Sequence, residues 1–302
     1  MLVLKSLVLI LLILATGCKS GRKQGPGTID EQESGEIVQR IEAMKQVYHL
    51  CPSPAEMLSI IYVADLGFEE DLLDPVSNID HYLDTRSTTL ALGIYATDLA
   101  YCALFGRHEE TLNYLEAVRS LAEQIRVTGA IDDKMIQQAR DNVESLDSLF
   151  AISNQAFINM MFFCERNERQ GTILMLSAGA FIESLYLAVN MVDDYDEAGT
   201  ILQHLTDQKY ALENLMSFAE SLSGEDENVS AVMDDLEPIV KIYEGLKAGG
   251  GAVTVATQSE ASEQQPKKLV IGGGSSPTPL SPSEFEELKK ETFRLRSRMV
   301  EG

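Results

Sequence analysis

The chain has 302 residues, of which 45% are hydrophobic, and a formal net charge of −23 at pH 7. This length suits one large or two modest domains with a sizeable core. The negative charge would repel phosphate backbones, and the basic residues are scattered apart from the segment FRLRSR near the C-terminus. The composition therefore argues against binding to nucleic acid.

The first seventeen residues have the outline of a signal peptide. Lys5 precedes an apolar run from Leu7 to Ala15, and small residues then lead to Cys18. The run is shorter than the roughly 20 residues that a transmembrane helix needs. The stretch LATGC resembles the lipobox of bacterial lipoproteins, whose cysteine is acylated. We expect residues 1–17 to be removed and Cys18 to anchor the protein in membrane lipid. The alternative is a secreted protein with an incidental cysteine.

The residues after the anchor bear on its location. Lys19 stands where lipoproteins of an inner membrane often carry aspartate, and no acidic cluster of a surface-export type follows. The resemblance therefore implies the periplasmic face of an outer membrane. Residues 18–28 comprise the lipidated cysteine and a Gly-rich segment, which we expect to be a flexible spacer between lipid and fold.

Residues 29–247 are predicted to form one α-helical domain, and the whole chain an all-α array or bundle of about 8–10 helices. Apolar residues recur at helical spacing, and no strand-like run interrupts them. Ser53 and Glu56 predict a capping box with Pro54 at the first helical position, and Gly67 should close that helix. Further helices are predicted over 77–105, 108–127, 132–166, 168–193, 198–222 and 227–247, with Gly106, Gly129 and Gly224 as stops.

The C-terminal part is more varied. Pro238 should kink the last of these helices or start it anew. Residues 248–282 form a predicted Gly/Ser/Pro-rich linker, in which two β-branched stretches could pair as a short hairpin. Within 283–302, Ser283 and Glu286 should cap an amphipathic helix that docks on the array or on a partner. Its apolar face carries Phe285, Leu288, Leu295 and Met299.

Two segments resemble each other internally. LALGIYATDLAY (90–101) and LSAGAFIESLYLA (176–188) both read glycine, any residue, aromatic, when Gly93 is set against Gly179. A duplicated helical unit would explain this likeness, but so would ordinary helix composition.

Several of these stretches also resemble a known family. PSPAEM, LLDPVSNIDHYL, LALGIYATDLAY and GAFIESLYLA are similar to a family of uncharacterised helical lipoproteins from Bacteroidetes-type bacteria, over most of residues 50–190. The resemblance implies the lipid anchor and a helical fold. It brings no activity with it, so no catalytic residue is carried over.

No motif identifies a reaction. The four histidines are far apart and form neither HExxH nor a Cys/His metal spacing. The acidic run DDYDEAG (193–199) begins like a calcium loop, but Leu205 stands where a bidentate glutamate is required. We expect no metal, no cofactor and no enzymatic activity.

Three cysteines remain besides Cys18. Cys102 and Cys164 lie within apolar helical runs, where a free cysteine behaves as a small hydrophobic side chain, and we expect both to be buried and inert. The alternative is a single disulfide among these two and Cys51 in an oxidising compartment.

Polar residues on two otherwise apolar helices are the best candidates for a site. Asp98 has Tyr95 and Tyr101 three residues to either side, so the three project from one face. The later helix carries a similar stripe, Glu183, Tyr186 and Asn190. These acids could hydrogen-bond buried tyrosines or a helix terminus and so fix one packing arrangement. They could instead line a polar pocket that receives a small ligand.

Two functional hypotheses follow. The first is a lipid-anchored, non-enzymatic protein of the cell envelope that acts as a helical interaction or scaffold module for another envelope protein. The alternative is a small-molecule-binding protein with an interhelical pocket around Asp98 and Glu183. An enzyme of unrecognised type is a third, weaker hypothesis, because catalytic residues need not form a sequence motif.

Overall fold

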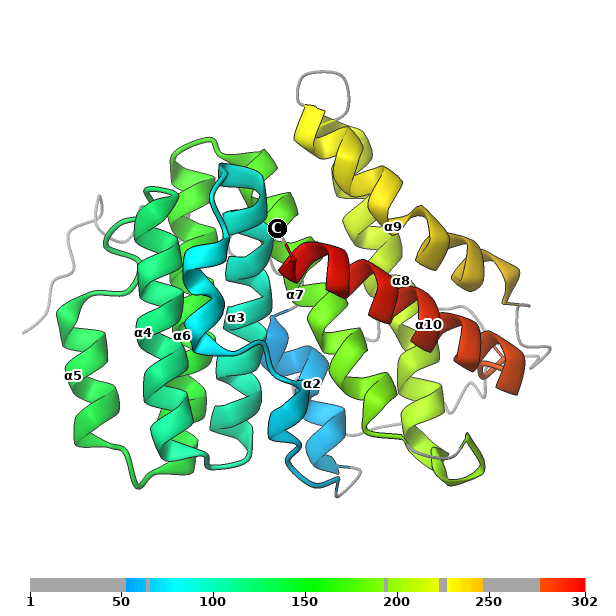
Figure 1. Cartoon of the computed structure of the whole chain (residues 1–302), viewed down its shortest axis with the longest axis horizontal. Helices are drawn as coiled ribbons and strands as arrows, with labels where there is room; N and C mark the ends of the chain where they lie inside the picture. Colours follow the sequence, from blue (N-terminus) through cyan, green and yellow to red (C-terminus); the bar gives the residue numbers. More distant parts are fainter. Residues whose placement is uncertain (1–52, 64–65, 193–194, 223–226, 247–277, 302) are drawn as a thin grey trace, which may run out of the picture. The chain divides into compact units, whose positions relative to one another are not determined.

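A computed structural model describes residues 53–63, 66–192, 195–222, 227–246 and 278–301, all within one compact unit, Met44–Gly302. These residues form nine α-helices and no strand, which confirms the all-α prediction (Figure 1). The helices are α2 (Pro54–Val63), α3 (Thr85–Leu104), α4 (His108–Gln124), α5 (Asp133–Asp141), α6 (Leu146–Arg166), α7 (Gln170–Asn190), α8 (Gly199–Leu222), α9 (Glu227–Gly245) and α10 (Pro282–Val300).

Helices α3 and α7 form the centre of the array. Almost every residue of each is buried, as expected of helices that are apolar on all sides. They pack against each other more extensively than any other pair, and α4 and α6 flank α3. The C-terminal helix α10 contacts α7, α9 and α3 (Figure 1). The last helix in the chain therefore completes the covering of the two central ones.

Two glycines permit the close approach of α3 and α7. A Cβ added to Gly93 would lie 2.2 Å from the Leu176 oxygen, and one added to Gly179 would lie 2.1 Å from the Leu90 oxygen. Each glycine thus faces the carbonyl three residues before the other one. The glycine that the two segments share therefore has a packing role, since both helices need a missing side chain where they meet.

Helix α7 is the one described helix long and apolar enough, by length and composition, to cross a membrane. All of its most apolar window is buried inside the protein. Core helices of soluble proteins have the same character, so its composition reflects the central position of α7 in the array.

The predicted helix over 77–105 is interrupted in the structure. Residues Val76–His81 form a 3₁₀ helix, and α3 begins only after Asp84. The Asp84 carboxylate accepts hydrogen bonds from the backbone N–H groups of Arg86 and Ser87. This N-cap satisfies two of the unpaired donors of a helix start, and sequence periodicity alone did not separate the two elements.

The predicted single helix over 132–166 is also two helices, α5 and α6. Asn142 ends α5, and the Ser145 hydroxyl accepts a hydrogen bond from the Ser148 N–H to start α6. The prediction of one helix was wrong because both segments share the same apolar period. At the end of α3, Gly106 has a φ of +63°, as expected of a helix stop in the left-handed region.

Helix starts elsewhere test the capping predictions. The Ser53 and Glu56 box at α2 is confirmed, with Ser53 N–H to Glu56 Oε2 at 3.0 Å and Glu56 N–H to Ser53 Oγ at 3.3 Å. At α10 the prediction was two residues late, because the box uses Ser281 and Glu284. Pro282 then occupies the first helical position, which its fixed φ favours.

The α9 helix continues through Pro238 without a new start, which leaves the kink as the remaining alternative of the prediction. Several predictions fall outside the described residues, namely those on Cys18 with its spacer, Cys51, Gly224 and the hairpin in the linker. Cys102 and Cys164 are buried free thiols, as predicted, and they do not pair with each other.

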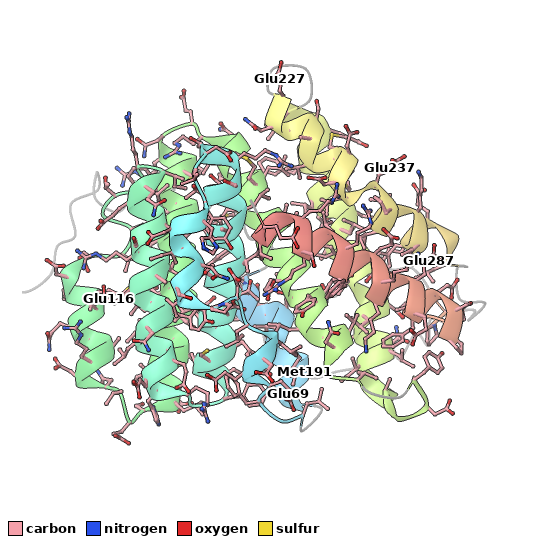
Figure 2. The ribbon with its side chains drawn as sticks, viewed as in Figure 1. Glu69, Glu116, Met191, Glu227, Glu237 and Glu287 are labelled. Atoms are coloured by element: carbon pink, nitrogen blue, oxygen red, sulfur yellow. The ribbon has the colours of Figure 1, made fainter. Side chains whose placement is uncertain are left out.

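Acidic side chains are spread over the surface of several helices. Glu116 on α4, Glu227 and Glu237 on α9, and Glu287 on α10 are all exposed (Figure 2). This distribution agrees with the strongly negative net charge of the chain.

Candidate functional site

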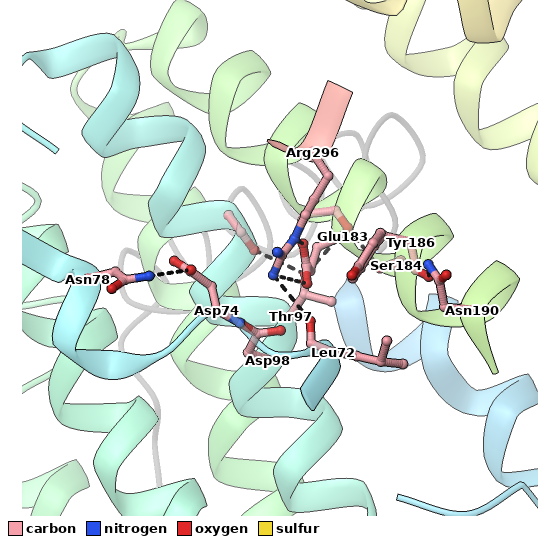
Figure 3. A network of polar contacts seen from close by, with 12 residues as sticks. Leu72, Asp74, Asn78, Thr97, Asp98, Glu183, Ser184, Tyr186, Asn190 and Arg296 are labelled. Carbon is pink, nitrogen blue, oxygen red and sulfur yellow. Dashed lines mark hydrogen bonds and ion pairs between the residues drawn. The ribbon is translucent and has the colours of Figure 1, made fainter. Parts of the chain in front are cut away.

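A bidentate ion pair joins α10 to α7 in the interior. Arg296 Nε donates to Glu183 Oε2 at 3.0 Å, and its Nη2 donates to Glu183 Oε1 at 3.2 Å (Figure 3). The same Nη2 donates to the Leu72 carbonyl at 3.2 Å. The Glu183 side chain is fully buried and that of Arg296 is 12% exposed. Two parallel bonds of this kind give both strength and a fixed orientation.

Asp98 on α3 lies beside this pair. Its side chain is fully buried, and its Oδ2 accepts the Asp74 backbone N–H at 3.2 Å. Its Oδ1 is buried and has no donor among the described residues. The Glu183 carboxylate acts electrostatically on Asp98, so two acids lie close together beside the Arg296 guanidinium.

The electrostatics differ between the two acids. Burial, reinforced by the nearby Glu183 carboxylate, raises the pKa of Asp98 well above its ordinary value. Burial also raises the pKa of Glu183, but the charge and the hydrogen bonds of Arg296 oppose this effect. Burial opposes the charge of Arg296, yet the pairing with Glu183 raises the pKa of the guanidinium. Burial therefore favours the neutral form of Asp98, whereas Arg296 favours the ionised form of Glu183.

Asp74 connects the loop before α3 to this group. Its Oδ2 accepts the Tyr82 hydroxyl at 2.6 Å, its Oδ1 accepts Asn78 Nδ2 at 2.9 Å, and its backbone oxygen accepts the Tyr114 hydroxyl at 2.8 Å. Burial, together with the Asp74 carboxylate, raises the pKa of Tyr82. We call Asp74, Asp98, Glu183 and Arg296 the buried polar cluster.

The structure assigns other partners to the two tyrosines predicted beside Asp98. The Tyr95 hydroxyl donates to the Pro75 carbonyl at 2.7 Å, and the Tyr101 oxygen accepts the Glu69 N–H at 2.9 Å. Burial raises the pKa of Tyr101 to about 12. Both tyrosines therefore hold the loop before α3, and neither donates to Asp98.

Only part of the predicted polar stripe on α7, formed by Glu183, Tyr186 and Asn190, joins the buried polar cluster. The Arg296 guanidinium lies 4.5 Å from the centre of the Tyr186 ring, a cation–π contact. Asn190 instead donates to the Tyr186 carbonyl within its own helix at 2.7 Å. Of the six predicted residues, Asp98, Glu183 and Tyr186 thus belong to one constellation, whereas Tyr95, Tyr101 and Asn190 serve the backbone.

Sequence reasoning missed Asp74 and Arg296. Asp74 precedes Pro75 in a loop, where no periodicity marks it. Arg296 lies beside the apolar face of α10, formed by residues such as Thr292 and Leu295. A long basic side chain adjoining an apolar stripe is the one signal that could have suggested burial of its stem.

The carboxylates of the buried polar cluster are enclosed. Asp98 and Glu183 are each 0% exposed, and the three pockets described below are lined by other residues. Those pockets lie between α8 and α9, between α2, α7 and α8, and at the ends of α3 and α10 beside α9. The described residues contain no group of three metal-binding side chains.

Fold and cluster together define an all-α protein whose C-terminal helix is held by a buried ion pair. Comparison of this chain with protein-family models, with curated proteins and with solved structures gives no significant match.

Proposed function

We propose that this protein is a lipid-anchored, non-enzymatic component of the cell envelope that acts as a helical interaction or scaffold module. The main structural support is that the acids of the buried polar cluster already bind other groups of the protein. Both Glu183 oxygens bind Arg296, and Asp98 binds the backbone of Asp74, so these acids serve packing. A rigid array with its polar interior engaged in this way suits a surface that other proteins recognise. The LATGC stretch supports the anchor.

The alternative, a small ligand between the helices at Asp98 and Glu183, has less support. A ligand there would have to replace hydrogen bonds that the protein already makes, and displacing Arg296 would leave a buried Glu183 without its partner.

Two measurements test the proposal. Cells are labelled with an alkyne fatty acid and the wild type is compared with Cys18→Ser; the wild type should take up label and the variant should not. A photo-crosslinking residue is then placed at Phe293, which is 57% exposed on α10, and at exposed Lys134 on α5 as a control. Discrete crosslinked envelope proteins are expected at Phe293 and not at Lys134. Absence of label would refute the anchor, and absence of adducts at Phe293, or the same adducts at both positions, would count against an interaction module.

A further inference from the structure

We draw no further inference here: the strongest candidate, the open groove between α8 and α9, is an acidic cluster of Glu213, Glu220 and Glu244 over a floor that includes the buried Leu212 and Tyr243, and no unpartnered buried polar side chain among the described residues lines it to indicate a ligand.

Discussion

The pairing of Arg296 with Glu183 is the interaction whose contribution to stability a single substitution can test most directly. Arg296→Ala leaves an ionised carboxylate fully buried without its partner, and such a loss costs about 3–5 kcal/mol of unfolding free energy. Arg296→Lys should recover part of it, since an ammonium keeps the charge but cannot form two parallel bonds. Urea unfolding followed by circular dichroism measures both. Arg294→Ala removes only a surface pair and should cost about 0.5 kcal/mol. Equal losses at the two positions would contradict the buried pair.

Replacing Asp98 by a side chain of the same shape should cost less stability than truncating it. Asp98→Asn preserves the form of the neutral acid and offers an N–H donor to Glu183, so it should cost less than about 1 kcal/mol. Asp98→Ala should cost about 1–3 kcal/mol, because the buried Asp74 N–H loses its acceptor. Thermal and urea melts of the two variants decide it, and a larger loss for Asn than for Ala would refute a protonated Asp98.

Asp98 also gives a prediction about pH. Its pKa is raised in the folded protein, so below about pH 4 both states hold the proton and the group has no effect. At higher pH the unfolded chain releases the proton and the folded chain retains it, which favours unfolding. The wild type should therefore lose stability relative to Asp98→Asn as the pH rises above about 4, by up to about 1.4 kcal/mol per pH unit for as long as the folded protein retains the proton. The other groups facing Asp98, namely Glu183, Arg296 and Asp74, are common to both proteins. Urea melts at each pH measure the difference, and a constant gap would be inconsistent with the raised pKa.

At the scale of elements, the contact between α3 and α7 depends on two missing side chains. Gly93→Ala would bring a Cβ to within 2.2 Å of a backbone oxygen, which cannot move aside as a flexible side chain could. The helices would have to separate, at a cost of about 3 kcal/mol or more. Gly245→Ala, near the end of α9 with nothing within 4 Å, is the control and should be neutral or stabilise by up to about 1 kcal/mol. The melting temperatures of both variants test this, and similar values would contradict the close approach.

Periodicity predicts the elements better than it predicts their ends. The apolar pattern gave α4, α7 and α8 nearly at their observed positions, because it runs without a break along each of them. It joined α5 to α6, since the break at Ser145 depends on a cap that leaves the apolar period unchanged. At α10, two serines stand near the helix start, and the helix uses Ser281 because Pro282 follows it.

The sequence predicted the acidic residues of the candidate site but not their basic partner. Asp98 and Glu183 are conspicuous because a carboxylate within an apolar helix must find a partner. Their partner, Arg296, lies 113 residues beyond Glu183 in the sequence, and no local pattern connects the two positions. Pairings of that range are decided by how helices assemble, which single-sequence periodicity does not encode.

For the whole molecule, we expect the fold to be independent of divalent metal. The described residues offer no cluster of three metal ligands, and the interior is held by apolar packing and by the buried polar cluster. Addition of a chelator should leave the helical circular dichroism and the melting temperature unchanged. A drop of several degrees, restored by calcium, would point to the acidic run at 193–199.

The position of Arg296 has a consequence for biosynthesis. The ribosome releases the chain from its N-terminal end, so Glu183 leaves it more than one hundred residues before the arginine that neutralises it. Until then, α3 and α7 carry an uncompensated acid on the face that α10 will cover. A nascent or prematurely terminated chain that lacks Arg296 should consequently stay open at this face and be a preferred substrate for chaperones and proteases. Chains with α10 in place would then be protected, whereas chains without it would be removed by proteases.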